Sequence, residues 1–340
     1  MKMHDDLRKS RQIASAALDQ MPPRVLRMSI PRVVNTAREW WRANHVLDDL
    51  DSDRIHDDLA RVADACGHLG VTTYRELHRH AADVIKEVTS LASPTAYALR
   101  EDADALNRTR NSIGAALSAV AQHHGADAAI AIAAMPDVAP RAGGSHRLPA
   151  DDEILLLRQR ALHTIVQGGQ RLIEGCQYSL VETGMTPVET TEIRGTDFDH
   201  LRAPTTVHSK GGPYNGERTL ALPPWACPVV AARLDEQCAG SDRAVHDRLC
   251  FTGKPGAIAS ASAATNLRRY MYESGFTLHD RPVPQAIVGW RVARVMTAQG
   301  WDDAQILLGK KQVAQVERFL GQFIIVAPEI PKLIATFDGF

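Results

Sequence analysis

Pairs of basic residues recur along the predicted helices of this chain, and the chemistry they could do is to neutralise phosphate groups. A guanidinium group can grip phosphate oxygens with two parallel hydrogen bonds, and an ammonium group attracts them as a point charge. The candidate contacts are Arg108, Arg110, Lys210, Arg268, Arg269, Arg291, Arg294, Lys310 and Lys311. A solvated helix surface carries such residues too, so only their placement in the fold can give them a role.

The charge of the whole chain does not favour a nucleic-acid partner. Its 340 residues include 39 Lys and Arg against 40 Asp and Glu, a formal net charge of −1. Proteins that bind nucleic acid draw most of their affinity from phosphate neutralisation and usually carry a basic excess. An interaction of this kind must therefore rest on local patches.

The other reactive side chains do not form a recognisable metal, nucleotide or thiol site. His78 and His80 are two residues apart, which places them on different sides of a helix. The stretch Gly253-Lys254-Pro255-Gly256 lacks the spacing of a phosphate-binding loop. No CxxC pair occurs, so we interpret the cysteines as reduced thiols. They are Cys66, Cys176, Cys227, Cys238 and Cys250. We expect no metal and no cofactor.

Composition predicts a globular protein of the cytoplasm. Hydrophobic residues make up 44% and charged residues 23% of the chain, a balance that can bury real cores. No apolar stretch approaches the roughly 18 residues that a membrane span needs, and residues 1–20 lack the apolar core of a signal peptide. At roughly 100–200 residues per domain, the length predicts two domains and we expect no membrane partner.

Helical periodicity runs through residues 31–135, behind a polar lead at 1–30. Apolar side chains recur there at helical spacing. One such face holds Val33, Ala37, Trp40 and Trp41. Thr73 followed by Glu76 predicts a capping box at a helix start. We therefore expect residues 31–135 to form a helical domain.

The second half of the chain is predicted to mix helices with one hairpin. Residues 136–148 are rich in Pro, Gly and Ala and predict a linker. In residues 149–322, two short strands at 205–210 and 218–222 flank a Gly-rich turn. The predicted helices cover 151–165, 172–182, 225–239, 262–274, 284–299 and 302–308. The fold class is thus mainly α with a small β-hairpin, an α+β fold. The apolar tail at 323–340 must fold back or dock on a partner.

Three segments of the second half, taken in order, resemble motifs of the tyrosine recombinase (phage integrase) family. Residues 180–199, which include Thr183-Gly184-Met185, are similar to a helix–turn–helix that opens with Thr-Gly-Leu-Arg in that family. Residues 207–223 are similar to its β-hairpin, which carries an active-site lysine. Residues 283–319 are similar to its C-terminal segment. The resemblance implies a helical core-binding-like domain, a linker and a recombinase-like catalytic-type domain.

The chain departs from the family at the residues that carry the chemistry. In that family two arginines, a lysine and two histidine-like residues grip the scissile phosphate, which a tyrosine attacks. The matching positions here are Thr186, Lys210, Ala286, Gly289, Lys310 and Phe319. Only Lys210 keeps the family's residue type. Phe319 has no hydroxyl group and cannot form a phosphotyrosyl bond. Without arginines, the charge of the transition state also loses its bidentate donors. We therefore predict that strand cleavage is lost.

Two alternatives would keep catalysis. Arg291 could be the second arginine if the register slips by two residues, although that shift turns it by about 200° to the opposite helix face. Tyr270 or Tyr272 could act as the nucleophile, although both precede the segment that should hold the phosphate-gripping groups.

The resemblance implies duplex DNA as the partner, because family members close around a duplex. We expect a DNA-binding, catalytically degenerate recombinase-like protein that serves DNA recombination or integration of a mobile element as an accessory or regulatory factor. The alternatives are an active site-specific recombinase with a displaced site, and a protein–protein assembly module without DNA affinity. Family members commonly pass the C-terminal segment to a neighbouring subunit. The tail at 323–340 therefore implies a contact with a second copy or a related recombinase.

Overall fold

The computed structural model describes most of the chain in eight stretches. They are residue 18 and residues 21–92, 99–126, 147–212, 215–239, 241–251, 257–276 and 283–323. Most of the predicted lead, residues 136–146 of the predicted linker, and the tail after Phe323 lie outside the described residues. Within the described residues the chain is mostly helical and has one two-stranded antiparallel sheet. The predicted α+β class, mainly α with a small hairpin, is confirmed.

The first half is a set of packed helices. They are α2 (Pro23–Leu26), α3 (Ile30–Ala43), α4 (Ser52–Leu69), α5 (Tyr74–Arg79), α6 (Ala81–Ala92) and α7 (Leu99–His123). The predicted capping box begins α5: the Glu76 amide donates to Thr73 Oγ1 over 3.3 Å, and the Thr73 amide donates to Glu76 Oε2 over 3.0 Å. The segment before α3 is also packed, since the Tyr74 amide donates to the Met28 carbonyl over 2.9 Å.

The second half places helices around the hairpin. Its helices are α9 (Asp151–Gln167), α10 (Gly169–Glu182), α11 (Cys227–Cys238), α12 (Ala257–Glu273), α13 (Gln285–Gln299), α14 (Trp301–Leu308) and α15 (Val313–Leu320). Short 3₁₀ turns are η1 (Glu189–Thr191), η2 (Gly195–Asp197) and η3 (Asp242–His246). The strands β1 (Thr206–Ser209) and β2 (Arg218–Ala221) pair with Val207 opposite Leu220. The predicted helices and both strands are present, and α15 is an element that the sequence pattern did not mark.

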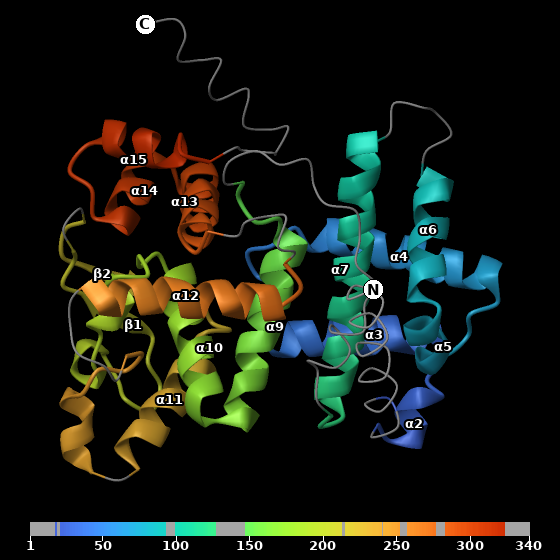
Figure 1. Ribbon diagram of the computed structural model, residues 1–340, viewed down its shortest axis with the longest axis horizontal. Coiled ribbons are helices and arrows are strands. Elements are labelled where there is room, and N and C mark those ends of the chain that lie inside the picture. Colours follow the sequence, from blue (N-terminus) through green and yellow to red (C-terminus); the bar gives the residue numbers. More distant parts are fainter. Residues whose placement is uncertain are drawn as a thin grey trace, which may run out of the picture.

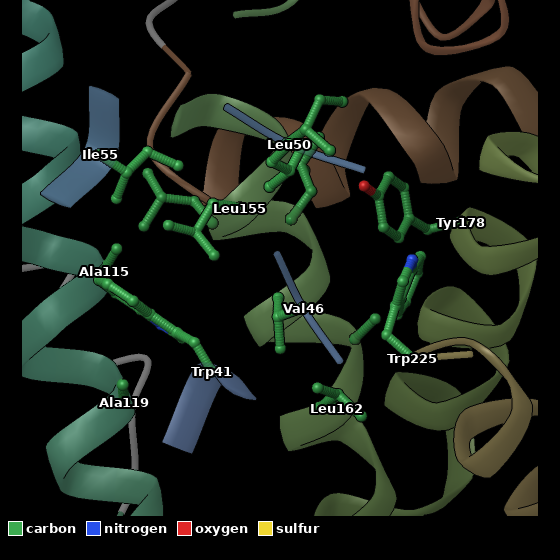
Figure 2. Close-up of a cluster of buried hydrophobic side chains, with 14 of the residues drawn as sticks. Trp41, Val46, Leu50, Ile55, Ala115, Ala119, Leu155, Leu162, Tyr178 and Trp225 are labelled. Atoms are coloured by element: carbon green, nitrogen blue, oxygen red, sulfur yellow. The ribbon is translucent and has the colours of Figure 1, made fainter. Parts of the chain in front are cut away.

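The two halves lie side by side, with α7 of the first against α9 of the second (Figure 1). The segment between α3 and α4 joins them, because its Val46 is fully buried and its Leu50 nearly so. Figure 2 shows Val46 and Leu50 pointing among side chains of the second half, including Leu155, Leu162 and Trp225. The hydrophobic core is therefore continuous from one half to the other.

Among the described residues, no helix is long and apolar enough to cross a membrane.

Candidate functional site

A buried ion pair occupies the place where the recombinase-like motifs meet. Glu189 lies in η1, just after Thr186, and Arg218 opens β2. Glu189 Oε1 accepts from Arg218 Nη1 over 2.6 Å, and its Oε2 accepts from the amide and hydroxyl of Thr186 over 2.7 and 2.9 Å. Ser209 at the end of β1 donates to the same carboxylate over 2.9 Å. Burial raises the pKa of Glu189, but the hydrogen bond and charge of Arg218 outweigh it, and the pKa lies below its usual range.

Arg218 has every donor of its guanidinium group engaged. Nε donates to the Leu307 carbonyl over 2.7 Å, and Nη1 donates to Glu189 and, over 3.0 Å, to the Gly216 carbonyl. Nη2 donates to Glu189 Oε2 and to the Gly184 carbonyl, each over 3.1 Å. A guanidinium group has five N–H donors, and all five are used inside the protein. Arg218 therefore ties the hairpin to α14 and to the turn before η1, and it has no donor left for a phosphate.

Sequence reasoning missed the Glu189–Arg218 pair. Both residues stand inside the motif segments, and the alternation of β2 places Arg218 and Leu220 on the buried face. A charged residue on the inward face of a short strand requires a buried partner. That signal could have singled out Arg218.

The lysines predicted as phosphate contacts lie close to this pair. Lys310 is half-buried after α14, and burial together with the Arg218 charge lowers its pKa. Lys210 is 62% exposed and contacts Asp197 Oδ1 at 3.3 Å. Lys311 is exposed. Of these lysines, Lys310 is the one on which the charges of the saturated Arg218 and of Glu189 act.

Apolar side chains fill the position that matches the family's second arginine. A Cβ atom at Gly289 would lie 2.7 Å from Leu148 Cδ2 and 2.9 Å from Phe323 Cε2, closer than real contacts allow. Phe323 in turn meets Phe319, the position that matches the nucleophile, edge to face at 5.5 Å between ring centroids. Ala286 in the same helix is buried. The described residues thus hold an apolar plug over α13.

The two alternative nucleophiles lie in α12. Tyr270 is fully buried and its hydroxyl donates to the Leu157 carbonyl over 2.8 Å. Burial raises its pKa well above the usual range. Tyr272 is half-buried and packs against the core. The Tyr270 oxygen is therefore engaged and shielded from solvent.

The basic segment of α7 faces the second half of the molecule. Arg110 is buried, and its Nη1 donates to the Gly275 carbonyl over 3.3 Å. Asn111 donates to Asp152 Oδ2 over 2.6 Å. Arg108 is half-buried, and its charge acts on Asp58 of α4. In this segment, which we predicted to contact DNA, Arg110 and Asn111 meet the turn after α12 and the start of α9.

The other predicted pairs of basic residues differ in how many of their members already form an ion pair with a carboxylate. Arg268 and Arg269 are exposed on α12, and Arg269 pairs with the buried Glu174 of α10. Arg291 and Arg294 project from α13 toward the first half and the start of α9, where Arg291 pairs with Asp49 and Arg294 pairs with Asp151. Arg291, the alternative second arginine, is thus held by a carboxylate. The structure does not bring all the predicted residues to one surface.

Among the described residues, no group of three or more His, Cys, Asp and Glu side chains could hold a metal ion. His78 is buried, and burial lowers its pKa to about 4. The five cysteines are free thiols, and Cys176 and Cys250 are in contact at 3.7 Å between sulfur atoms.

No protein-family model and no curated protein matches the sequence. Among solved structures, the chain is similar to XerA recombinase, with a TM-score of 0.45, 12% identity, and coverage of 92% of this chain and 99% of that one. It is also similar to a lambda integrase dimer bound to a COC′ core site, with a TM-score of 0.36, 15% identity, and coverage of 83% and 76%. Both TM-scores lie below 0.5, so a function for this chain must be argued from its own residues.

Proposed function

We propose that this chain is a DNA-binding protein with the two-domain plan of a tyrosine recombinase that does not cut DNA strands. The domains would be residues 31–135 and 149–322. The observation that carries the proposal is the apolar plug over α13, in which Phe319 and Phe323 pack where a nucleophile and a phosphate-gripping arginine would stand. Such a protein would act as an accessory or regulatory factor in DNA recombination or integration.

The chemistry of strand transfer supports the loss of cleavage. An attacking oxygen and donors aimed at the developing phosphate charge must converge on one point. Phe319 offers no oxygen, and Gly289 has no room for a side chain. Arg218, whose charge acts on Lys310, donates all its N–H groups to the protein itself. The Tyr270 oxygen is buried against Leu157.

The surface proposed to meet the duplex consists of those predicted phosphate contacts that are exposed in the second half. These are Lys210, Arg268, Arg269 and Lys311, with the half-buried Lys310 beside them. We leave Arg110 out of this surface because it is buried between the halves. Phosphate contacts of this kind position a protein on DNA without reading its sequence.

A binding assay at two salt concentrations tests the proposal. Fluorescence anisotropy with labelled duplexes should give an affinity that falls steeply with salt, because bound phosphates release their counterions. The variant Lys210→Gln/Lys311→Gln should bind more weakly and with a flatter salt dependence. Absence of binding to every duplex at low salt would contradict DNA binding.

Cleavage is tested separately with nicked suicide duplexes. The wild-type protein and Phe319→Tyr should both give no covalent DNA adduct on denaturing gels, because a restored hydroxyl would still lack the arginines. An adduct formed by wild type and abolished by Tyr270→Phe or Tyr272→Phe would identify an active recombinase with a displaced site instead.

A protein–protein assembly module is the second candidate. Several predicted contacts are already paired with carboxylates, as in Arg269–Glu174 and Arg294–Asp151, and the chain is nearly neutral. In this case the partner would be a second copy or a related recombinase, with the tail at 323–340 as the exchanged segment. Analytical ultracentrifugation of the full chain and of a chain ending at Gln322, without DNA, distinguishes the two. A self-association that needs the tail, without any DNA binding, would favour the assembly module.

A further inference from the structure

Two carboxylates hold the arginines of α13. Asp49, in the segment between α3 and α4, pairs through Oδ2 with Arg291 and through Oδ1 with Arg158 at 2.6 Å. Asp151, the first residue of α9, pairs through Oδ2 with Arg294. Its Oδ1 accepts from Trp290 Nε1 over 2.9 Å. Each arginine therefore receives from the protein the kind of oxygen that a phosphate would offer.

Both pairs stand at the edge of the junction between the halves rather than deep inside it. The side chains of Arg291 and Asp49 are 21% and 32% exposed, and those of Arg294 and Asp151 are 37% and 20% exposed. By contrast, Arg158 and Glu182 behind them are fully buried. A phosphate oxygen could therefore replace either rim carboxylate without the buried pair being broken.

We propose that Asp49 and Asp151 act as internal stand-ins for phosphate, masking a phosphate-binding pair, Arg291 and Arg294, until DNA displaces them. This inference rests on the proposed DNA binding and adds its regulation. A guanidinium group that stays paired with a carboxylate neutralises less of a phosphate's charge, so fewer counterions leave the DNA when the protein binds. Masking therefore limits both the affinity of the resting protein and its salt dependence.

Two double variants each remove two carboxylate charges, one at the masking positions and the other away from them. Asp49→Asn/Asp151→Asn removes the masking charges. The control Asp48→Asn/Asp303→Asn removes two carboxylates away from Arg291 and Arg294, since Asp48 pairs with His45, at 3.3 Å, and Asp303 is exposed on α14. Because Asp49 also pairs with the buried Arg158, the single variant Asp151→Asn is the fallback should the double variant not fold.

The first measurement needs no DNA. Each protein is treated briefly with phenylglyoxal, which modifies accessible guanidinium groups, and the rate at each arginine is read by peptide mass spectrometry. Arg268 is exposed and should react equally in all variants. We expect Arg291 and Arg294 to react several-fold faster in Asp49→Asn/Asp151→Asn, and Arg294 alone in Asp151→Asn, than in wild type or the control. Equal rates in all proteins would overturn the masking, whatever the protein does with DNA.

The second measurement is the salt dependence of duplex binding. Each guanidinium group freed for a phosphate should steepen the slope of log Kobs against log salt by about 0.9. The unmasked variant should therefore bind more tightly at low salt and show the steeper slope. The gain should vanish when Arg291→Gln/Arg294→Gln is added. If wild type binds DNA and the unmasked variant has the slope of the control, the masking is wrong and the proposed function stands. If neither protein binds DNA, the proposed DNA binding is wrong. The phenylglyoxal modification rates alone then decide whether Arg291 and Arg294 are masked.

Discussion

At the scale of single residues, the most consequential contact is the buried pair Glu189–Arg218. The folded-state pKa of Glu189 lies below its ordinary value of 4.5, so the unfolded chain takes up the proton first as the pH falls. The pair therefore stabilises the protein above about pH 4.5, and this contribution is lost as the pH drops toward the folded-state pKa. Urea unfolding at pH 7, 5, 4 and 3 should show this decline.

Removing the charge of Glu189 should cost stability at neutral pH and flatten that decline. Glu189→Gln leaves the buried Arg218 without its counter-charge, which typically costs about 3–5 kcal/mol. The matched control is Glu192→Gln, because the Glu192 side chain is 50% exposed where it pairs with the half-buried Arg248. Its cost should be within about 1 kcal/mol. Equal urea midpoints for the two variants would show that Arg218 is held by its backbone acceptors alone.

At the scale of elements, α13 packs its glycine against two apolar side chains. Gly289→Ala should destabilise the protein by about 1–3 kcal/mol, because the new methyl group overlaps Leu148 and Phe323. In the background Phe323→Ala the same substitution should cost clearly less, since one of the clashing rings is gone. Thermal unfolding of the four proteins gives this coupling. Additive costs would mean that Phe323 does not lie over α13.

Elements whose signals are local were predictable from the sequence, and contacts between elements were not. The capping box at Thr73 and the hairpin at 206–221 follow from residues a few positions apart, and both are present. The segment around Arg110 reads as a basic, exposed helix start. It is buried because Gly275 and Asp152, distant in sequence, lie against it. Spacing along one helix cannot show which neighbouring element covers it, and for this reason Arg110 was predicted to face DNA.

At the scale of the whole molecule, the continuous core indicates that the two halves unfold together. Val46 from the first half is fully buried among residues of the second (Figure 2). Val46→Ala removes two buried methyl groups and should cost about 1.5–3 kcal/mol. Calorimetry should then show one transition shifted as a whole. Two separate transitions in wild type would mean that the halves are independent domains joined loosely.

Arg158 makes charged contacts with the segment between α3 and α4, where Val46 makes apolar ones. Replacing Arg158 tests which of these contacts hold the two halves together. Its guanidinium group meets Glu182 of α10, the Val46 carbonyl and Asp49, and it lies 5.5 Å from the Trp225 ring centre. Arg158→Met alone leaves Glu182 buried without its cation and should cost about 3–5 kcal/mol. Arg158→Met/Glu182→Gln removes both charges and should recover much of that loss, because no carboxylate is then buried without its cation. Hydrogen exchange at residues 44–51, the segment between α3 and α4, separates the effect on overall stability from the effect on how this segment is held against the second half. Faster exchange there in the double variant, at regained stability, would show that the charges position this segment. Unchanged exchange would show that Val46 and Leu50 alone hold it in place.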